Sequence, residues 1–453
     1  MTPPRAQRQS APGPGLLEFF RSLPEFRQDP LQHFFQAAKE YGDVVRYRSV
    51  WSAYQLSHPD HIQQVLQSNF SNYRKGRDYK ILRLSLGNGL LNSEGARWQR
   101  QRKMTQPAFQ SQQVGRFARI MTSQMEALLA RWETLAAQKT IFDVVPEFMG
   151  LTLNIASQAL FTTSLESDAP SIQEMLTVGR EYSVNRAWSV VAMPLSFPTE
   201  RNRRYRRSIA AFHAIIDRMV AERRATSERP GDLLTMLMEA RDENGQAMSD
   251  RQLRDEIATL LTAGHETTTL VLAWTCFLIS TRPHVIERIA AEAAFLNGNV
   301  PNYEDLVRLK YTRTVVEEAM RLYPPVWVLS RTAVKADVIG NYRIAGGSEI
   351  LIFPYITHRH PKWWPEPESF CPERFAPENS PSRPRYAYLP FGAGPRTCVG
   401  SNFAVTEILV VLAMLLQRFR LELAIDPSAV RAEPSVTLRP DPGVPVRLHR
   451  IER

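Results

Sequence analysis

The chain of 453 residues has little cysteine, and this scarcity excludes two common kinds of site. Its three cysteines, Cys276, Cys371 and Cys398, cannot build a disulfide framework, and no two of them form the CxxC pair of a structural zinc site. They also fall short of the thiolate set that an iron–sulfur cluster normally needs. A functional cysteine in this chain would therefore act singly.

The sequence also lacks a signal peptide, a repeat and a linker. Its opening, Met1–Gly15, is polar and rich in proline, which favours a cytoplasmic protein with a flexible tail over residues 1–17. No fixed-period repeat or shift in composition divides the remainder. Residues 18–453 are therefore expected to form a single large domain, mainly α with a minor β-sheet region.

Two apolar stretches could be mistaken for membrane spans. Ile257–Ser280 is long enough to cross a bilayer, but His265 and Glu266 interrupt it. Val405–Leu416 is too short and contains Glu407. Both are predicted to be buried core helices, so we expect no membrane span.

Positive charge is in excess, with 56 Lys and Arg against 46 Asp and Glu. The basic residues do not interleave with an aromatic motif, so nucleic acid is not an expected partner. The excess is either a set of solvated side chains or a target for an acidic partner protein.

Periodicity and turn residues give a coarse outline of the chain. A long irregular segment, His360–Pro395, is rich in proline, and its length suggests a functional role. A hairpin is predicted over Asp43–Ser57 and short strands over Val328–Ile352. Helices are predicted over His58–Gln67, over most of Gln110–Met238, and over Arg251–Ser280, Glu287–Asn297, Thr312–Leu322 and Ser401–Phe419.

A glycine-rich loop, FGAGPRTCVG, precedes the last predicted helix. Gly392 and Gly394 let the backbone turn tightly and approach a flat ligand. Cys398 stands just before the helix, whose N-terminal end favours a nearby anion. Arg396 is placed to reach an acidic group on a bound cofactor. The alternative is a buried, inert cysteine in a glycine-rich loop.

This loop resembles the FGxGxRxCxG signature of the cytochrome P450 superfamily, in which a cysteine thiolate holds the haem iron. The resemblance covers about residues 30 to 450. It implies the P450 fold, haem b as the cofactor and Cys398 as the metal ligand. It also implies cofactor contacts from Phe391, Gly392, Gly394, Arg396 and Gly400.

A second motif places Glu318 and Arg321 three residues apart on one helix face. Such a pair alone is usually a surface ion pair that contributes little to the stability of the fold. Together with the downstream PERF sequence at Pro372–Phe375, it resembles the ExxR and PERF pair of the same family. The implied role of Glu318, Arg321 and Arg374 is structural: they interlock and hold the irregular segment. A planar guanidinium suits this role, and lysine would replace Arg321 poorly.

A third motif, AGHETT, begins at Ala263 inside the long predicted helix. Gly264 costs this helix about 1 kcal/mol relative to alanine. Thr267 can donate back to the carbonyl of Ala263 and open the helix locally. The alternative is that these residues form a polar notch in a core helix that the fold tolerates and that has no function.

AGHETT resembles the oxygen-activation motif of the family. By this resemblance, Thr267 and Glu266 are catalytic: Thr267 holds dioxygen and a water, and Glu266 feeds protons inward. Ala263 and Gly264 would lie against the haem. His265 occupies a variable position and receives no role.

Further resemblances concern the two carboxylates of the haem. Trp98 and Arg102 match the WxxxR pattern, whose spacing puts both on one helix face. Arg331 looks like the arginine that binds a propionate after the ExxR helix. With Arg396, three guanidiniums would neutralise two carboxylates in a poorly solvated site.

The resemblance implies a monooxygenase that activates dioxygen and hydroxylates or epoxidises a small lipophilic substrate, with fatty acids and terpenoids the first candidates. LGNGLL at Leu86–Leu91 looks like the branch that oxidises such molecules and suggests a bacterial enzyme. Parts of Tyr73–Leu91 and Glu181–Pro198 would cover an apolar pocket. The residues expected to line that pocket are Val326, Trp327, Val328 and Leu329.

No flavin or nicotinamide motif is found in the sequence. Electrons would then come from a separate ferredoxin or flavodoxin with an NAD(P)H-dependent reductase, and the chain is expected to be a monomer. Arg97, Arg100 and Lys103, on the WxxxR helix, are the expected electrostatic target for the carrier. The basic run Arg201–Arg207 is expected to be a solvated helix face.

Three other interpretations stay open. A haem-thiolate peroxygenase or isomerase needs no reductase, but such branches typically lack an acid–threonine pair like Glu266 and Thr267. A non-catalytic haem sensor would need neither this pair nor a substrate pocket. A membrane-anchored enzyme is disfavoured by the N-terminal sequence.

Overall fold

Contacts between residues group the chain into two units. The computed structural model describes residues 10–48, 52–188, 193–379 and 383–451. Unit 1 comprises Met1–Ile81, Met320–Phe370 and Pro377–Cys398. Unit 2 comprises Leu82–Ala319, Cys371–Ala376 and Val399–Arg453. Helices α5 (Tyr79–Leu86) and α14 (Lys310–Leu322) each carry the chain from one unit to the other.

A five-stranded sheet forms the centre of unit 1. Its strand order is β1–β2–β8–β5–β3, and only the β2–β8 pair is parallel. The predicted hairpin is confirmed, with Val44 paired to Leu56 and Arg48 to Ser52. Two buried apolar clusters lie against this sheet, one containing Ile350 and Ile352 and the other Phe34 and Phe353.

The remaining elements of unit 1 are short, since prolines and glycines interrupt the chain often. The predicted helix after the hairpin ends in a π-helical turn, η1 (Gln64–Ser68). The unit contains α1 (Leu16–Arg21), α2 (Leu23–Gln28), α3 (Pro30–Tyr41), β1 (Val44–Arg48), β2 (Ser52–Leu56), α4 (Pro59–Gln63), β3 (Tyr73–Lys75), β5 (Leu329–Ala333), β6 (Asp337–Ile339), β7 (Tyr342–Ile344), β8 (Glu349–Ile352) and α15 (Pro354–Thr357).

The described part of the predicted tail makes contacts with unit 1. Ala11 is buried, and the carbonyl of Pro12 accepts a hydrogen bond from the Arg46 amide at 2.7 Å. Helix α1 already begins at Leu16. The division between a tail at residues 1–17 and a domain at 18–453 stays a prediction.

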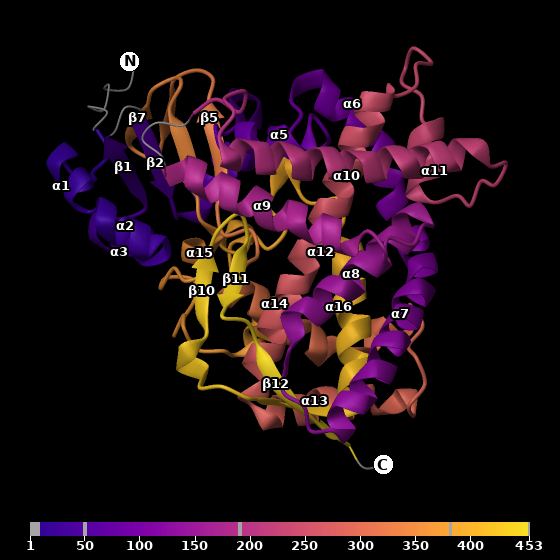
Figure 1. Ribbon diagram of the computed structural model, residues 1–453. Coiled ribbons are helices and arrows are strands. Elements are labelled where there is room, and N and C mark those ends of the chain that lie inside the picture. Colours follow the sequence, from indigo (N-terminus) through magenta and orange to yellow (C-terminus); the bar gives the residue numbers. More distant parts are fainter. Residues whose placement is uncertain (1–9, 49–51, 189–192, 380–382, 452–453) are drawn as a thin grey trace. The chain divides into compact units, whose positions relative to one another are not determined.

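Unit 2 is a helical assembly around α12 (Figure 1). Its helices are α6 (Gly95–Thr105), α7 (Ser111–Ala137), α8 (Val144–Phe161), α9 (Ala169–Trp188), α10 (Glu200–Ala225), α11 (Leu233–Glu239), α12 (Asp250–Ser280), α13 (Pro283–Ala293) and α16 (Ser401–Leu416). The mainly helical fold with small sheets is therefore confirmed, and the long helix begins one residue before its predicted start.

Helix α12 is fixed to α8 through buried polar contacts. The hydroxyls of Thr152 and Thr269 lie 2.8 Å apart. His265, which had no predicted role, places Nε2 2.8 Å from the carbonyl oxygen of Met149. Because burial lowers the pKa of His265, the ring is neutral and Nε2 donates this bond. These contacts set the rotation of α12 about its axis.

The C-terminal strands of unit 2 were not predicted. They are β9 (Phe419–Leu423), β10 (Arg431–Pro434), β11 (Leu438–Asp441) and β12 (Pro445–Arg450); β12 also pairs with β4 (Phe142–Asp143). Prolines and charged residues break the alternation that normally indicates a strand. The predicted last helix ends at Leu416, and Phe419 opens β9.

Among the described residues, no helix by itself combines the length and apolarity needed to cross a membrane. The pair formed by α12 and Pro283–Leu296, bent by 115°, meets that test on length and composition when the two are taken together.

Glu407, in the apolar helix α16, lowers the stability of the folded protein. It is 1% exposed, and neither carboxyl oxygen has a hydrogen-bond partner among the described residues. Burial raises the pKa of Glu407 well above the usual range. In the folded protein Glu407 therefore stays protonated at pH values at which it has already lost its proton in the unfolded chain. Stability is therefore lost as the pH rises.

We expect Glu407→Leu to raise the free energy of unfolding by about 1–3 kcal/mol, because it removes an uncompensated buried polar group. Thermal unfolding at pH 6 and pH 8 measures the effect, which grows with pH. Glu407→Gln is the matched control: it removes the titration but keeps a buried polar group. A leucine variant no more stable than the parent at pH 8 would contradict the assignment.

Candidate functional site

The glycine-rich loop of unit 1 folds back on itself and presents Cys398. The Cys398 amide donates to the carbonyl of Phe391 at 2.9 Å, and Cys398 is exposed. Gly392 and Gly394 have φ values of +66° and +72°, which side chains disfavour. A Cβ on Gly394 would also lie 1.8 Å from the carbonyl oxygen of Leu66, in η1. The loop therefore needs both glycines.

The three cysteines differ sharply in environment. Cys276 is enclosed in α12, and burial raises the pKa of its thiol to about 12. The Cys371 sulfur lies 3.7 Å from a carboxylate oxygen of Glu373. Cys398 alone combines an exposed sulfur with a position just before the N-terminus of α16. It is the cysteine best placed to bind an external group.

A buried guanidinium in unit 1 has no anionic partner among the residues that the structure describes. Arg331 is 7% exposed and donates to the carbonyl of Ser330 at 2.8 Å, but no carboxylate of the described residues lies within ion-pair distance. Buried Tyr79 hydrogen-bonds to Arg331, and Arg396 lies close enough to act on its charge. Because a buried unpaired charge is costly, this cluster fits an anionic group such as a carboxylate of a bound cofactor. Sequence reasoning gave Tyr79 no individual role.

Arg321 and His358 tie the irregular segment to α14 within unit 1. The Arg321 guanidinium donates to the carbonyls of His358, Pro367 and Ser369 at 3.0, 2.6 and 3.0 Å. His358 Nε2 accepts from the Leu389 amide at 2.7 Å, so Nδ1 carries the proton and donates to the Arg321 carbonyl at 3.2 Å. Burial, followed by the charge of Arg321, lowers the pKa of His358 to about 3. Sequence reasoning missed this histidine.

Glu318 holds the PERF sequence within unit 2. Its carboxylate is fully buried and accepts from the Cys371 amide at 2.8 Å. The same oxygen lies 3.4 Å from Nε of Arg374. Glu318 and Arg321 therefore bind different stretches of the irregular segment.

Helix α12 opens at the predicted position. The Thr267 hydroxyl donates to the carbonyl of Ala263 at 2.7 Å. Ala263 is exposed although most of α12 is buried, and a Cβ on Gly264 would meet nothing within 4 Å. This face of the helix leaves room for a flat group to approach its backbone.

Glu266 is engaged in an ion pair that the sequence did not reveal. Its carboxylate accepts from Arg439 at 2.6 Å and from the Thr437 hydroxyl at 3.1 Å. The side chains of Glu266 and Arg439 are 12% and 19% exposed. Arg439 lies in β11, a strand that was not predicted, and no local signal near Glu266 indicates a partner so distant in the chain.

The predicted cofactor contacts of α6 are partly visible within unit 2. Trp98 is buried, at 8% exposure. Arg102 is half-buried, and its Nε lies 3.4 Å from the Gln106 side-chain oxygen. The two residues lie one helical turn apart.

The docking surface predicted on α6 lies beside acidic residues, and its role in binding an electron carrier stays a prediction. Arg100 donates to Asp242 at 2.8 Å and to Gln252 at 2.7 Å, and Lys103 lies 3.4 Å from Glu243. Their charges are therefore partly neutralised by an acidic turn that sequence reasoning did not pair with this helix. Arg97 remains exposed.

The predicted pocket residues differ in exposure within unit 1. Val326 is 39% exposed. Trp327 and Val328 pack against a core cluster, with the Trp327 ring 5.8 Å from that of Phe353. Leu329 packs against the other cluster. Residues 189–192 of the predicted roof lie outside the described residues.

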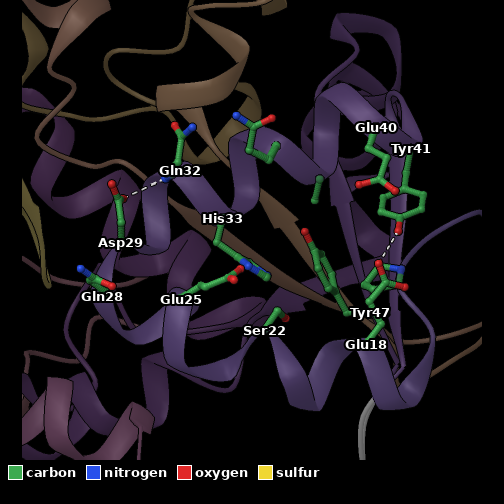
Figure 2. Close-up of a pocket in the computed structure, with 13 residues that line it drawn as sticks. Glu18, Ser22, Glu25, Gln28, Asp29, Gln32, His33, Glu40, Tyr41 and Tyr47 are labelled. Atoms are coloured by element: carbon green, nitrogen blue, oxygen red, sulfur yellow. Dashed lines mark hydrogen bonds between the residues drawn. The ribbon is translucent and has the colours of Figure 1, made fainter.

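A cavity of about 370 Å³ in unit 1 is lined by none of the predicted site residues. It lies among α1, α2 and α3 and is acidic, with Glu18, Glu25 and Glu40 around His33 (Figure 2). The Tyr41 hydroxyl donates to Glu18 at 3.0 Å. The carboxylates that line this cavity do not suit a haem, because the side groups of a haem are themselves anionic.

Comparison with known proteins identifies the family. Residues 11–445 match the model of the cytochrome P450 family, and the chain belongs to it. Among similar proteins, cyclooctatin synthase of Streptomyces melanosporofaciens is 36% identical over 91% of this chain and 90% of its own length. From the same organism, cyclooctat-9-en-7-ol 5-monooxygenase is 33% identical over 92% and 91%. Pentalenene oxygenase of Streptomyces avermitilis is 31% identical over 90% and 88%.

The chain is a cytochrome P450 monooxygenase, and the predicted haem-thiolate cofactor is confirmed by the family. The family also needs dioxygen and a source of electrons. Within unit 1, the exposed cysteine and buried Arg331, which has no carboxylate partner among the described residues, fit a haem.

We expect Arg321→Lys to weaken haem retention and to lower the free energy of unfolding by about 3 kcal/mol or more. One ammonium group cannot reproduce the planar set of donors that serves three carbonyls, and buried acceptors left without partners are costly. Thermal unfolding and the haem content of purified protein measure both effects. Arg343→Lys, at an exposed position of β7, is the control. Equal behaviour of the two variants would contradict the role of Arg321.

Proposed function

We propose that this enzyme inserts one oxygen atom of dioxygen into a terpenoid, using electrons from a separate ferredoxin or flavodoxin. The observation that carries the proposal is the opening of α12, where Thr267 bonds to Ala263 and exposes a polar notch in a buried helix. A haem, when bound, supplies the activation of dioxygen and the transfer of one oxygen atom, while the second atom leaves as water.

The proposed roles of the haem-binding residues follow from their chemistry. Cys398 would provide the thiolate that holds the haem iron, and the turn at Gly392 and Gly394 aims it away from its own loop. Arg331 and Arg396, with Tyr79 as a neutral donor, bind a carboxylate of the cofactor. Trp98, Arg102, Phe391, Gly400, Ala263 and Gly264 are proposed to complete the binding site.

Thr267 and Glu266 are proposed to position and deliver protons. The Thr267 hydroxyl directs its own proton to Ala263, so it can accept a hydrogen bond from a water that lies beside dioxygen in the notch. Glu266 must part from Arg439 before it can exchange a proton inward. The ion pair therefore holds the Glu266 side chain in place until it turns.

Support for a terpenoid substrate comes from the relatives. Pentalenene oxygenase, cyclooctatin synthase and cyclooctat-9-en-7-ol 5-monooxygenase are enzymes that oxidise terpenoids. The residues proposed to line the pocket, Val326 to Leu329, include apolar and aromatic side chains that suit such a ligand. A fatty acid is the second candidate.

An external electron carrier agrees with the absence of flavin and nicotinamide motifs in the sequence. Arg97 stays the proposed electrostatic contact on α6, because it is exposed. The monomeric state and the cytoplasmic location stay predictions, which sedimentation and cell fractionation would test.

A peroxygenase is the second candidate, and a haem sensor the third. Retention of Thr267 and Glu266 in the open part of α12 disfavours both, since neither requires proton delivery to dioxygen.

We expect Cys398→Ser to abolish the thiolate-type absorption spectrum of the reduced, CO-bound protein, because an alcohol is a poor replacement for a thiolate ligand. Cys371→Ser is the matched control and should keep the spectrum. A thiolate-type spectrum in the Cys398 variant would overturn the assignment of the ligand.

We expect NADPH with a surrogate ferredoxin and its reductase to support oxidation of a cyclic terpene that shifts the haem spectrum on binding. Product formed only with added hydrogen peroxide would refute the monooxygenase proposal. Thr267→Ala should still bind haem and substrate but release at least about tenfold more hydrogen peroxide per product, because its proton relay is broken. Parallel titrations with terpenes and fatty acids decide the substrate class.

A further inference from the structure

The π-helical turn η1 lies directly against the glycine-rich loop in unit 1. The carbonyl oxygen of Leu66 faces Gly394 so closely that a Cβ on this glycine would lie 1.8 Å from it. Gly394 opens the short 3-10 helix η9 (Gly394–Arg396), and Cys398 follows two residues after this helix. The backbone of η1 therefore supports the part of the loop that presents the cysteine.

Apolar packing reinforces this contact. The side chains of Val65 and Leu66, in η1, are 1% and 3% exposed. Leu389, just before the loop, belongs to the same buried cluster, and Ala393 of the loop packs against it. Because protein interiors are close-packed, a displacement on one side of such a contact is transmitted to the other. A movement of η1 would therefore move the loop.

A single carboxylate holds both ends of η1. Turns of this kind are rare, which indicates that surrounding contacts select them. Nε2 of Gln64, the first residue of η1, donates to Oδ2 of Asp337 at 3.3 Å and to the Val338 carbonyl at 2.7 Å. Nδ2 of Asn69, which follows the last residue of η1, donates to the same Asp337 oxygen at 3.0 Å. Asp337 thus joins the two ends of the turn through one oxygen atom.

The carboxylate of Asp337 has two further donors. The Tyr73 hydroxyl, from β3, donates to Oδ2 at 2.6 Å, and the Val338 amide donates to Oδ1 at 2.8 Å. Burial opposes ionisation of Asp337, but the hydrogen bonds, led by that of Tyr73, outweigh it and lower its pKa. Asp337 is therefore ionised at neutral pH, and hydrogen bonds to an ionised acceptor are among the strong ones.

The hairpin that carries Asp337 has a fixed place beside the same helix. Gly340, in the turn between β6 and β7, has a φ of +56°. A Cβ at this position would lie 2.8 Å from Nε2 of His61, in α4. Helix α4 continues directly into η1. The hairpin therefore contacts the chain on both sides of the point where the π-helical turn begins.

We propose that Asp337 is a positioning residue for Cys398: it keeps η1 in its π-helical form, and η1 holds the glycine-rich loop. This deepens the proposed function and rests on it for the role of Cys398 as the haem ligand. Arg321 and His358 fix the chain that leads into the loop. Asp337 acts through η1 on the loop itself, so the cysteine is held from two directions.

Hydrogen exchange of the haem-loaded protein, followed by mass spectrometry, tests this support. The amides of Thr397 and Cys398 are hydrogen-bonded within the loop. Asp337→Asn should make them exchange about tenfold faster, because it removes the charge that strengthens the hydrogen bonds to η1. Gln64→Ala should act in the same direction, while peptides of α12 exchange as in the parent. Gln63→Ala, at the exposed neighbouring position, is the matched control. Parental exchange of the loop in both test variants would refute the proposal.

The CO-bound spectrum provides a second readout. On mild warming, the thiolate-type spectrum of the reduced protein should be lost about tenfold faster in Asp337→Asn than in Gln63→Ala. Asn69→Ala and Tyr73→Phe each remove one donor to the carboxylate, and they replace Asp337→Asn if that variant does not fold. A lower unfolding temperature with parental loop exchange and parental loss of the spectrum would show a merely structural role and overturn the proposal.

The failure of this proposal can be told apart from that of the proposed function. If Cys398→Ser keeps the thiolate-type spectrum, the assignment of the ligand fails. Hydrogen exchange in Asp337→Asn still decides whether Asp337 holds the loop, because it reports on the loop amides and not on the iron ligand.

Discussion

The buried guanidinium of Arg321 is the constraint on which unit 1 depends. With no exposed surface, its donors must be satisfied by the protein, and the main-chain carbonyls of His358, Pro367 and Ser369 do so. The irregular segment, which lacks regular hydrogen bonding, thereby gains fixed positions at residues 367 and 369, and the chain just before it gains one at residue 358. Those positions precede the glycine-rich loop, so the hydrogen bonds of one buried guanidinium order the chain that leads to Cys398.

His358 extends this order toward the cysteine. It joins the Arg321 carbonyl to the Leu389 amide, two residues before Phe391, whose own carbonyl binds the Cys398 amide. The ring works only when neutral, because Nε2 must accept a hydrogen bond. Its low pKa is therefore a consequence of its place, surrounded by protein and beside a permanent positive charge.

The sequence allowed the motif residues to be predicted but not their partners. Cys398, Arg321 and Thr267 each stand in a short pattern whose chemistry is local, and the Thr267 bond to Ala263 follows from helix geometry. Arg439 contacts Glu266 from β11, a strand that was not predicted because prolines break its sequence pattern. The lesson is physical: spacing along a helix reveals which side chains share a face, but a cross-element ion pair depends on packing.

Helix α12 shows how a buried helix can carry polar side chains without losing stability. Thr269 bonds back to its own helix and to α8, His265 bonds to α8, and Glu266 pairs with β11. Each of these partners removes a polar group from further use. The hydroxyls of Thr259 and Thr262 are buried in the same helix and have no partner among the described residues.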